Sequence, residues 1–403
     1  MTHTPPLKTS AAPAWDGLPM PRRLWAIVAV AFGVSLSVID GAIANVALPT
    51  IGRELGISEA DSIWIVNAYQ LAIMVSLLSF SALGDVVGYR KIYLGGLALF
   101  TLASVGCACS YSFATLVLTR VLQGFGAAAV TSVNTTLIRN IYPRAQLGRG
   151  MGINATVVAV SAVAGPTLAA AILSVASWPW LFAVNIPVGV TAFVLSRRYL
   201  PQNPVLVRDH RFDWRDGVLN ALTFGLLIAS IEGFSHGLDP RLIAFGVAAL
   251  LLIGFFFVRR QLREPYPILP FDLLRIPIFT VSVLTSICSF IAQMLALVAL
   301  PFYLQHACGY DEVETGLLMT AWPAIIMVVA PVAGYLVERI HAGLLGGMGL
   351  TAMCAGLLLL AFLPDNPPQG EIIWRLMLCG AGFALFQSPN NSILIASAPP
   401  PRG

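Results

Sequence analysis

The sequence predicts an all-α polytopic membrane protein, and three observations support that prediction. Of the 403 residues, 57% are hydrophobic and only 10% are charged, and the mean hydropathy is +0.81. Soluble domains, by comparison, are about 25% charged. Apolar runs near the length that crosses a hydrocarbon core of about 30 Å recur along the chain. Several motifs also return in the same order, which indicates a duplicated module.

Twelve apolar segments are expected to cross the membrane as helices, because each is close to the roughly 20 residues that span a bilayer. They lie at about 24–49, 63–82, 92–109, 113–138, 149–173, 179–197, 216–235, 240–258, 279–304, 315–337, 344–363 and 371–396. The first run is too long for a cleaved signal peptide and contains Asp40, so we expect it to remain as the first helix.

The basic residues predict the orientation of these helices. With the N-terminus in the cytoplasm, alternate loops collect the positive charge, as the positive-inside rule requires. In this arrangement, all but four of the 23 Lys and Arg residues lie on the cytoplasmic side. The four exceptions are Arg53, Arg120, Arg241 and Arg375. The net charge of +4 therefore reflects topology, and we expect a lipid bilayer as partner and no nucleic acid.

The repeat groups the helices. Val46-Ala47-Leu48-Pro49 returns at Val298–Pro301, Leu83-Gly84-Asp85 as Leu336-Val337-Glu338, and Gly124-Phe125-Gly126 as Gly380-Ala381-Gly382. This predicts a cytoplasmic tail at 1–23, a six-helix bundle at 24–198, a two-helix insert at 199–276 and a partial second bundle of four helices at 277–403. By analogy with the first half, we expect 6+2+4 helices of a complete 6+2+6, so that the sequence stops two helices short. In transporters, such repeats enclose the substrate path.

Asp40 is the first candidate functional residue, because an acid at the centre of a membrane helix costs about 2.5–3.5 kcal/mol on insertion scales. Gly33, Ser37, Ala44 and Ala47 share its helical face and suit a bundle interior. Asp40 could exchange a proton as its surroundings alternate between wet and dry. The structural alternative is a static ion pair.

Arg120 is the expected partner of Asp40. From helical rise, Asp40 lies about 13 Å before Pro49 at the outer end of the first helix, and Arg120 lies about 10 Å inside the outer start of the fourth helix near Phe113. The two charges therefore fall at similar depth. Three polar residues on the Arg120 face could line a polar path or hydrogen-bond between helices, namely Gln123, Thr131 and Asn134.

Several motifs resemble those of a known family. The segment Asp40–Pro49 resembles the first-helix signature of the fourteen-helix drug:proton antiporters of the major facilitator superfamily, and Arg120–Gly126 resembles their fourth-helix motif. The segments Gly165–Ala170 and Trp178–Gly189 resemble further motifs of this subfamily, with alanines replacing the usual glycine pair in the former. The resemblance implies a major facilitator fold and proton coupling through Asp40 and Arg120.

The segment Ser81–Lys91 resembles the superfamily's cytoplasmic motif, and it departs from that motif at Ser81, Val86 and Tyr89. Gly88 suits a tight turn, and Asp85 and Arg90 supply charges that could gate the cytoplasmic side. The alternative is a positive-inside anchor.

Three further features of the sequence have expected structural or functional roles. Gly165 and Pro166 are expected to form an antiporter hinge or tight seam, since proline removes a helix hydrogen bond and small residues pack closely; ordinary helix packing is the alternative. Trp178 and Trp180 are interpreted as interfacial anchors. Glu232, near the outer end of an insert helix, is a weak candidate for coupling or substrate contact.

The sequence contains no phosphate-binding loop, no dinucleotide fingerprint and no His-Glu-x-x-His site, so we expect no enzyme, no metal and no cofactor other than the coupling proton. We predict a monomeric, proton-driven exporter of lipophilic compounds, cations among them, in the cytoplasmic (inner) membrane, of the multidrug efflux type that confers antibiotic resistance. A proton-linked exporter of one metabolite and a non-transporting fragment are the alternatives.

Overall fold

The computed structural model describes residues 17–143, 146–202, 214–235, 239–262, 271–337, 339–364 and 367–397. These residues form helices joined by short loops, with no strand among them. Eleven helical segments in the described ranges are long and apolar enough to cross a membrane. The twelfth predicted segment corresponds to α9 (Trp214–Ser235), a helix of 22 residues. The predicted all-α, multi-pass membrane architecture is confirmed.

The described residues of the first half form eight helices. They are α1 (Arg22–Leu55), α2 (Glu59–Val87), α3 (Tyr89–Ala108), α4 (Phe113–Ser132), α5 (Asn134–Ile141), α6 (Leu147–Leu173), α7 (Pro179–Ala183) and α8 (Asn185–Tyr199). Two pairs of these helices each make a single membrane span, because α5 continues α4 and α8 continues α7. The six spans of the sequence prediction are therefore present.

Proline at position 49 does not end the first helix, contrary to the expectation from sequence. Helix α1 continues through Pro49 to Leu55, and Gly56 then ends it with a left-handed backbone (φ 64°). A proline removes one hydrogen bond of a helix but need not stop it when neighbouring helices pack around it. Pro49 is buried, and the helix α11 likewise contains Pro301.

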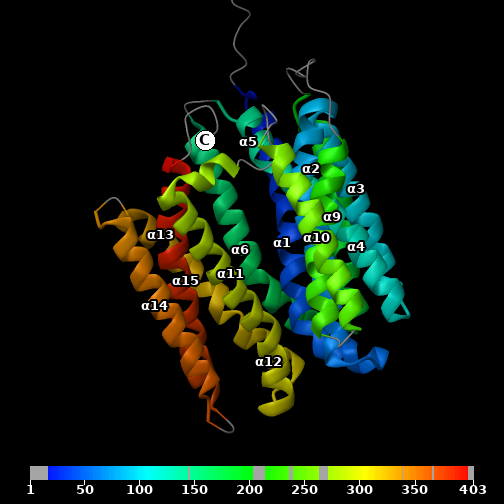
Figure 1. Cartoon of the computed structure of the whole chain (residues 1–403), viewed down its shortest axis with the longest axis vertical. Helices are drawn as coiled ribbons and strands as arrows, with labels where there is room; N and C mark the ends of the chain where they lie inside the picture. Colours follow the sequence, from blue (N-terminus) through cyan, green and yellow to red (C-terminus); the bar gives the residue numbers. More distant parts are fainter. Residues whose placement is uncertain are drawn as a thin grey trace, which may run out of the picture.

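The remaining described helices follow in order. They are α9, α10 (Pro240–Gln261), the 3₁₀ turn η2 (Phe271–Arg275), α11 (Pro277–Phe302), the π turn η3 (Tyr303–Ala307), α12 (Glu312–Met319), α13 (Ala321–Val337), α14 (Ala342–Ala361) and α15 (Gln369–Ser397). In Figure 1, α11 to α15 form one group and α1 to α4 another, with α9 and α10 against the latter. Helix α6 joins the groups, because it contacts α1 as well as α12 and α13.

The insert helices attach to the first half. Asp216 of α9 forms an ion pair with Arg260 of α10, which ties the two insert helices together. The side-chain amide of Asn220 on α9 donates to the carbonyl of Val75 on α2, at 2.9 Å. The insert therefore lies beside the first bundle and away from α11 to α15.

Glycines pack the two halves in equivalent ways. A Cβ on Gly124 of α4 would lie 2.5 Å from the carbonyl oxygen of Tyr69, and a Cβ on Gly380 of α15 would lie 2.5 Å from the carbonyl oxygen of Trp322. Such closeness leaves room only for glycine, so α2 meets α4 as α13 meets α15. The sequence repeat thus has a counterpart in helix packing, in which Tyr69 and Trp322 occupy equivalent positions.

Among the described residues, three apolar clusters form the core. Two belong mainly to the first half, one around Tyr93 and Phe100 and the other around Leu48 and Phe182. The third lies within α11 to α15 and includes Trp322. Each half therefore has its own packed interior. A substrate site is expected at the interface between the two halves.

Candidate functional site

Asp40 and Arg120 form a buried ion pair. The guanidinium Nη1 of Arg120 lies 2.5 Å from Oδ2 of Asp40, and the two side chains are 0% and 1% exposed respectively. The contact joins α1 to α4. The structure therefore brings together the two residues that helical rise placed at similar depth.

The other carboxylate oxygen of Asp40 accepts two further hydrogen bonds. Gln123 Nε2 donates to Oδ1 at 2.9 Å, and Asn185 Nδ2 donates to the same atom at 2.7 Å. Both Asp40 oxygens are thus engaged by side chains from α4 and α8, as a buried carboxylate requires. Three donors on two other helices therefore hold the Asp40 carboxylate.

Asn185 was missed at the sequence level. It lies within the segment Trp178–Gly189, whose tryptophans were interpreted as anchors with little direct chemistry. Asn185 is 2% exposed and begins α8, where its amide reaches Asp40 from 145 residues away. The available signal was a single amide in an otherwise apolar run, which in a membrane helix needs a partner.

Arg120 makes several contacts besides the ion pair. Its Nε donates to the carbonyl of Ile65 at 2.9 Å, and its Nη1 donates to Gln123 Oε1 at 2.6 Å. The guanidinium stacks over the ring of Tyr69, 4.2 Å from its centroid, and faces Phe182 at 5.5 Å. Its Nη2 has no hydrogen-bond partner within the described part of the chain.

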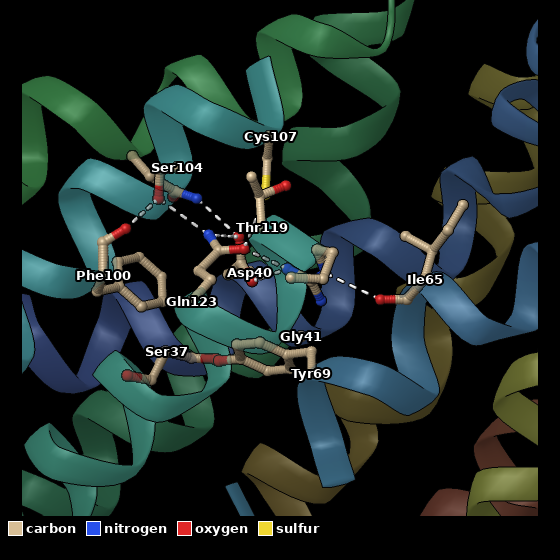
Figure 2. Close-up of polar contacts among 12 residues, drawn as sticks. Ser37, Asp40, Gly41, Ile65, Tyr69, Phe100, Ser104, Cys107, Thr119 and Gln123 are labelled. Carbon is tan, nitrogen blue, oxygen red and sulfur yellow. Dashed lines mark hydrogen bonds and ion pairs between the residues drawn. The ribbon is translucent and has the colours of Figure 1, made fainter. Parts of the chain in front are cut away.

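Helix α3 holds Gln123 in place. Gln123 Nε2 also donates to Ser104 Oγ at 2.9 Å, and Ser104 in turn donates to the carbonyl of Phe100 at 2.8 Å (Figure 2). Cys107 is buried and donates from Sγ to Thr119 Oγ1 at 3.3 Å. No group of His, Cys, Asp and Glu in the described ranges could hold a metal ion. Ser104 and Cys107 were not predicted as members of this network.

A cavity of about 330 Å³ lies beside the ion pair, between the two halves. Its first-half wall consists of Ser37, Val38, Gly41, Ala42, Asn45, Val46, Tyr69, Gln70, Ile73, Thr131, Ala162 and Pro166. Its second-half wall consists of Gln293, Met294, Leu297, Met319, Trp322, Pro323 and Ile326. Asp40 is not among the lining residues, because the cavity face of α1 carries Ser37, Gly41 and Asn45, one turn apart.

These features match a known family. Residues 30–403 match the profile of the Major Facilitator Superfamily. The chain belongs to the Major Facilitator Superfamily. Its relatives are transporters, so this facilitator is a transporter of small molecules and not an enzyme.

Three relatives cover nearly the whole chain. The facilitator is 59% identical to the uncharacterized transporter YebQ of Escherichia coli strain K12, over 95% of this chain and 84% of YebQ. It is 30% identical to the riboflavin transporter RibZ of Clostridioides difficile, over 94% of this chain and 82% of RibZ. It is 31% identical to the multidrug resistance protein Stp of Mycobacterium tuberculosis, over 94% of this chain and 71% of Stp.

A solved structure shares the fold. A transporter of the POT family, crystallised with 5-aminolevulinic acid, superimposes with a TM-score of 0.69 at 17% identity, over 94% of this chain and 85% of that one. At this identity the likeness concerns the fold. The predicted major facilitator fold is confirmed.

The three residues predicted to line a path have different surroundings. Thr131 lies in the cavity wall of the facilitator. Gln123 belongs to the Asp40 network, and Asn134 donates from Nδ2 to Asn154 Oδ1 of α6 at 3.0 Å. Neither Gln123 nor Asn134 is among the lining residues of the cavity. Their place on a substrate path remains a prediction.

The predicted cytoplasmic loop makes contacts within the first half. Gly88 forms the turn between α2 and α3 with φ 111°. The hydroxyl of Tyr89 donates to Asp85, and Arg90 donates to the carbonyl of Arg197 at the end of α8. No ion pair between Asp85 and Arg90 is present in the described ranges. Tyr89, at which the sequence departs from the family motif, is thus the partner of Asp85.

The predicted hinge lies at a close helix contact. A Cβ on Gly165 would overlap Ala42 of α1, so α6 packs tightly on α1 at this point. Pro166 lies inside α6 and in the cavity wall. Glu232 is part of α9, but its side chain lies outside the described residues. The motion expected of the hinge remains a prediction.

The two halves touch at the end where α1 finishes, which is the predicted outer end. The hydroxyls of Thr167 on α6 and Thr320 share a hydrogen bond of 2.9 Å. A Cβ on Gly316 of α12 would lie 2.9 Å from the carbonyl oxygen of Pro166. Two further contacts cross between the halves in the described ranges: Arg53 forms an ion pair with Glu312 at 3.7 Å, and Nδ1 of His306 lies 2.8 Å from Oε1 of Glu59. These contacts, called here the outer contacts, close the cavity at that end.

Proposed function

We propose that this facilitator is a proton-coupled exporter that works by alternating access, with Asp40 as the proton-binding group. The observation that supports this most directly is the Asp40 carboxylate, buried at 1% exposure and held by three displaceable donors. An ionisable residue inside a membrane protein is expensive and marks an ion pathway by default. Proton uptake at Asp40 would weaken its hold on Arg120 and so change how α1 sits against α4.

The second half offers no equivalent acid. At the offset of the Val-Ala-Leu-Pro repeat, Ala292 stands where the first half has Asp40. At the offset of the glycine repeat, Leu376 stands where the first half has Arg120, and Leu376 is fully buried. The proposed proton site therefore belongs to the first half alone, while both halves contribute to the cavity.

The energetics allow export without a nucleotide. Moving one charge through 100 mV supplies about 2.3 kcal/mol, and a tenfold gradient requires about 1.36 kcal/mol. One proton can thus sustain a roughly fiftyfold gradient of a neutral substrate. With the N-terminus placed in the cytoplasm, as we propose, the outer contacts would correspond to a state that faces the cytoplasm, in which substrate enters the cavity from that side.

The substrate class we propose is lipophilic small molecules. The cavity wall is largely apolar, with Met294, Leu297, Met319 and Ile326 on one side. Similarity to the multidrug resistance protein Stp agrees with this class. Export of one defined solute is the second candidate, because three amides line the cavity (Asn45, Gln70 and Gln293) and RibZ is named for a single vitamin. The setting we propose is the cytoplasmic membrane, with the N-terminus inside and one chain as the working unit.

The test uses substrate-induced proton release from the purified protein in lipid vesicles. Asp40→Asn should abolish proton release and proton-driven efflux while the protein stays folded. Asp216→Asn is the matched control, because Asp216 is a second buried aspartate paired with an arginine, but in the insert and outside the cavity wall. Unchanged proton-dependent efflux in Asp40→Asn would refute the assignment.

A further inference from the structure

We infer that Gln70 binds the polar group of the substrate, so that the cavity takes molecules with an apolar body and one hydrogen-bond acceptor, oriented with the acceptor toward α2. This inference rests on the proposed function, because it takes the cavity as the substrate site. Three observations support it: the exposure of the Gln70 side chain, its depth in the membrane and the apolar wall on the opposite side.

Gln70 is the accessible amide of the cavity wall. Three amides line the cavity, and Gln70 is the exposed one among them. Asn45 and Gln293 are only 9% and 8% exposed, so protein covers most of their side chains. The side chain of Gln70 makes no hydrogen bond within the described part of the chain. Its N–H donors are therefore available to a molecule in the cavity.

The other donors of the wall are engaged or covered. Ser37, Tyr69 and Thr131 each donate their hydroxyl proton to a backbone carbonyl, at 3.3, 3.0 and 2.8 Å respectively. The indole N–H of Trp322 is unpaired, but the atom is buried and out of reach of a ligand. No Asp, Glu, Lys or Arg lines the cavity in the described ranges. A substrate acceptor thus finds its donor at Gln70.

Gln70 lies near the middle of the membrane. It stands eleven residues, about 16 Å, after the start of α2 at Glu59, in a hydrocarbon core of about 30 Å. An amide without a partner is unfavourable in an apolar environment, and polar residues at this depth are expensive and mark substrate or ion paths. A substrate that accepts a hydrogen bond gives this amide a partner.

The opposite wall has no exposed counterpart of this amide. Tyr69 and Trp322 are equivalent in the repeat, so Pro323 stands where the first half has Gln70, and both of these residues line the cavity. Proline has no side-chain donor. The second half instead presents Met294 of α11, which is 40% exposed. A bound molecule therefore directs its acceptor toward α2 and its apolar body toward α11.

The experiment compares two neutral probes of similar shape on the purified full chain in lipid nanodiscs, without a proton gradient. Triphenylphosphine oxide carries one strong hydrogen-bond acceptor, whereas triphenylmethane carries none. Empty nanodiscs measure how much of each probe enters the lipid, and this amount is subtracted.

Gln70→Met keeps the length of the side chain and removes the amide. We expect it to weaken binding of the oxide by about fivefold, the effect of one lost hydrogen bond, and to leave binding of triphenylmethane unchanged. Unchanged binding of triphenylmethane also shows that the cavity of the variant is intact. An equal effect on both probes, or no effect on the oxide, would overturn the inference.

Two further variants locate the contact. Asn67→Leu is the matched control, because Asn67 is an exposed amide one turn before Gln70 on α2 but does not line the cavity. It should leave the affinity of both probes unchanged, and a selective loss of the oxide would refute the assignment to Gln70. Met294→Ala should weaken both probes by the same factor, since it removes apolar contact alone. A loss confined to the oxide in Met294→Ala would contradict the proposed orientation.

The proton site is tested separately. Asp40→Asn should bind the oxide as tightly as the unmodified protein, although it should fail in the proton-release assay. Because binding is measured without a gradient, the contact at Gln70 can fail while the proton site at Asp40 holds, and the reverse.

Discussion

The ring of Tyr69 separates the buried Arg120 from the cavity and contacts both. The guanidinium lies 4.2 Å from the ring centroid, and the residue also forms part of the cavity wall. Its hydroxyl donates to the carbonyl of Ser37 on α1 at 3.0 Å. In the proposed mechanism, a shift of this ring would act on Arg120, the partner of Asp40, and so would link the substrate cavity to the proton site.

Removal of the Tyr69 ring should uncouple substrate binding from proton release. Tyr69→Leu loses a cation–π contact of about 0.5–2 kcal/mol, so we expect substrate-induced proton release to fall severalfold. Tyr69→Phe keeps the ring and loses only the hydrogen bond to Ser37, so proton release should stay close to the unmodified level. The pair of variants is compared in the vesicle assay. Equal loss in both variants would show that the hydroxyl, rather than the ring, matters.

Removal of the Asn185 amide should destabilise the Asp40 network. Asn185→Leu leaves Oδ1 of Asp40 with one donor instead of two, and the loss of one hydrogen bond to a charged group costs about 1.5–3 kcal/mol. We expect a lower unfolding temperature in detergent and altered dependence of efflux on external pH. Asn220→Leu also removes a buried amide, but in the insert, and should change stability without changing the pH dependence. A pH profile that stays the same in Asn185→Leu would argue against its role.

Cysteines at Thr167 and Thr320 should trap the outer contacts. The two hydroxyls are 2.9 Å apart across the halves, so Thr167→Cys with Thr320→Cys should form a disulfide under mild oxidation in a background without the six native cysteines. Transport should stop on oxidation and recover on reduction. Transport that continues in fully cross-linked protein would mean that the outer end need not open.

The exposed ion pair between Arg53 and Glu312 should contribute little. The Arg53 side chain is 64% exposed and the charged atoms are 3.7 Å apart. Exposed pairs are worth at most about 1 kcal/mol, so Arg53→Gln should change efflux by less than about fivefold. Arg120→Gln, which leaves Asp40 buried without its cation, should abolish efflux by comparison. A large loss in Arg53→Gln would show that this pair holds the closed state.

Several features could be predicted from the sequence because they depend on local spacing. The spans follow from the length of apolar runs, and the similar depth of Asp40 and Arg120, which form an ion pair in the structure, follows from the position of each residue along its helix. The ends of the helices were less predictable, as Pro49 shows, since a buried proline can be accommodated by neighbouring helices.

The sequence by itself determined the membrane class, the repeat and the pair of charges. Only the tertiary structure decided that Asn185 completes the Asp40 network and that Trp322 faces the same cavity as Tyr69 from the other half. Only the tertiary structure showed that Asp40 and Asn45, five residues apart on α1, have different neighbours. Asp40 pairs with Arg120, whereas Asn45 lies in the cavity wall. The physical reason is that different faces of α1 pack against different helices. The depth of a residue along a helix follows from its position in the sequence. The partner of each helix face, in contrast, depends on how helices distant in the sequence pack together.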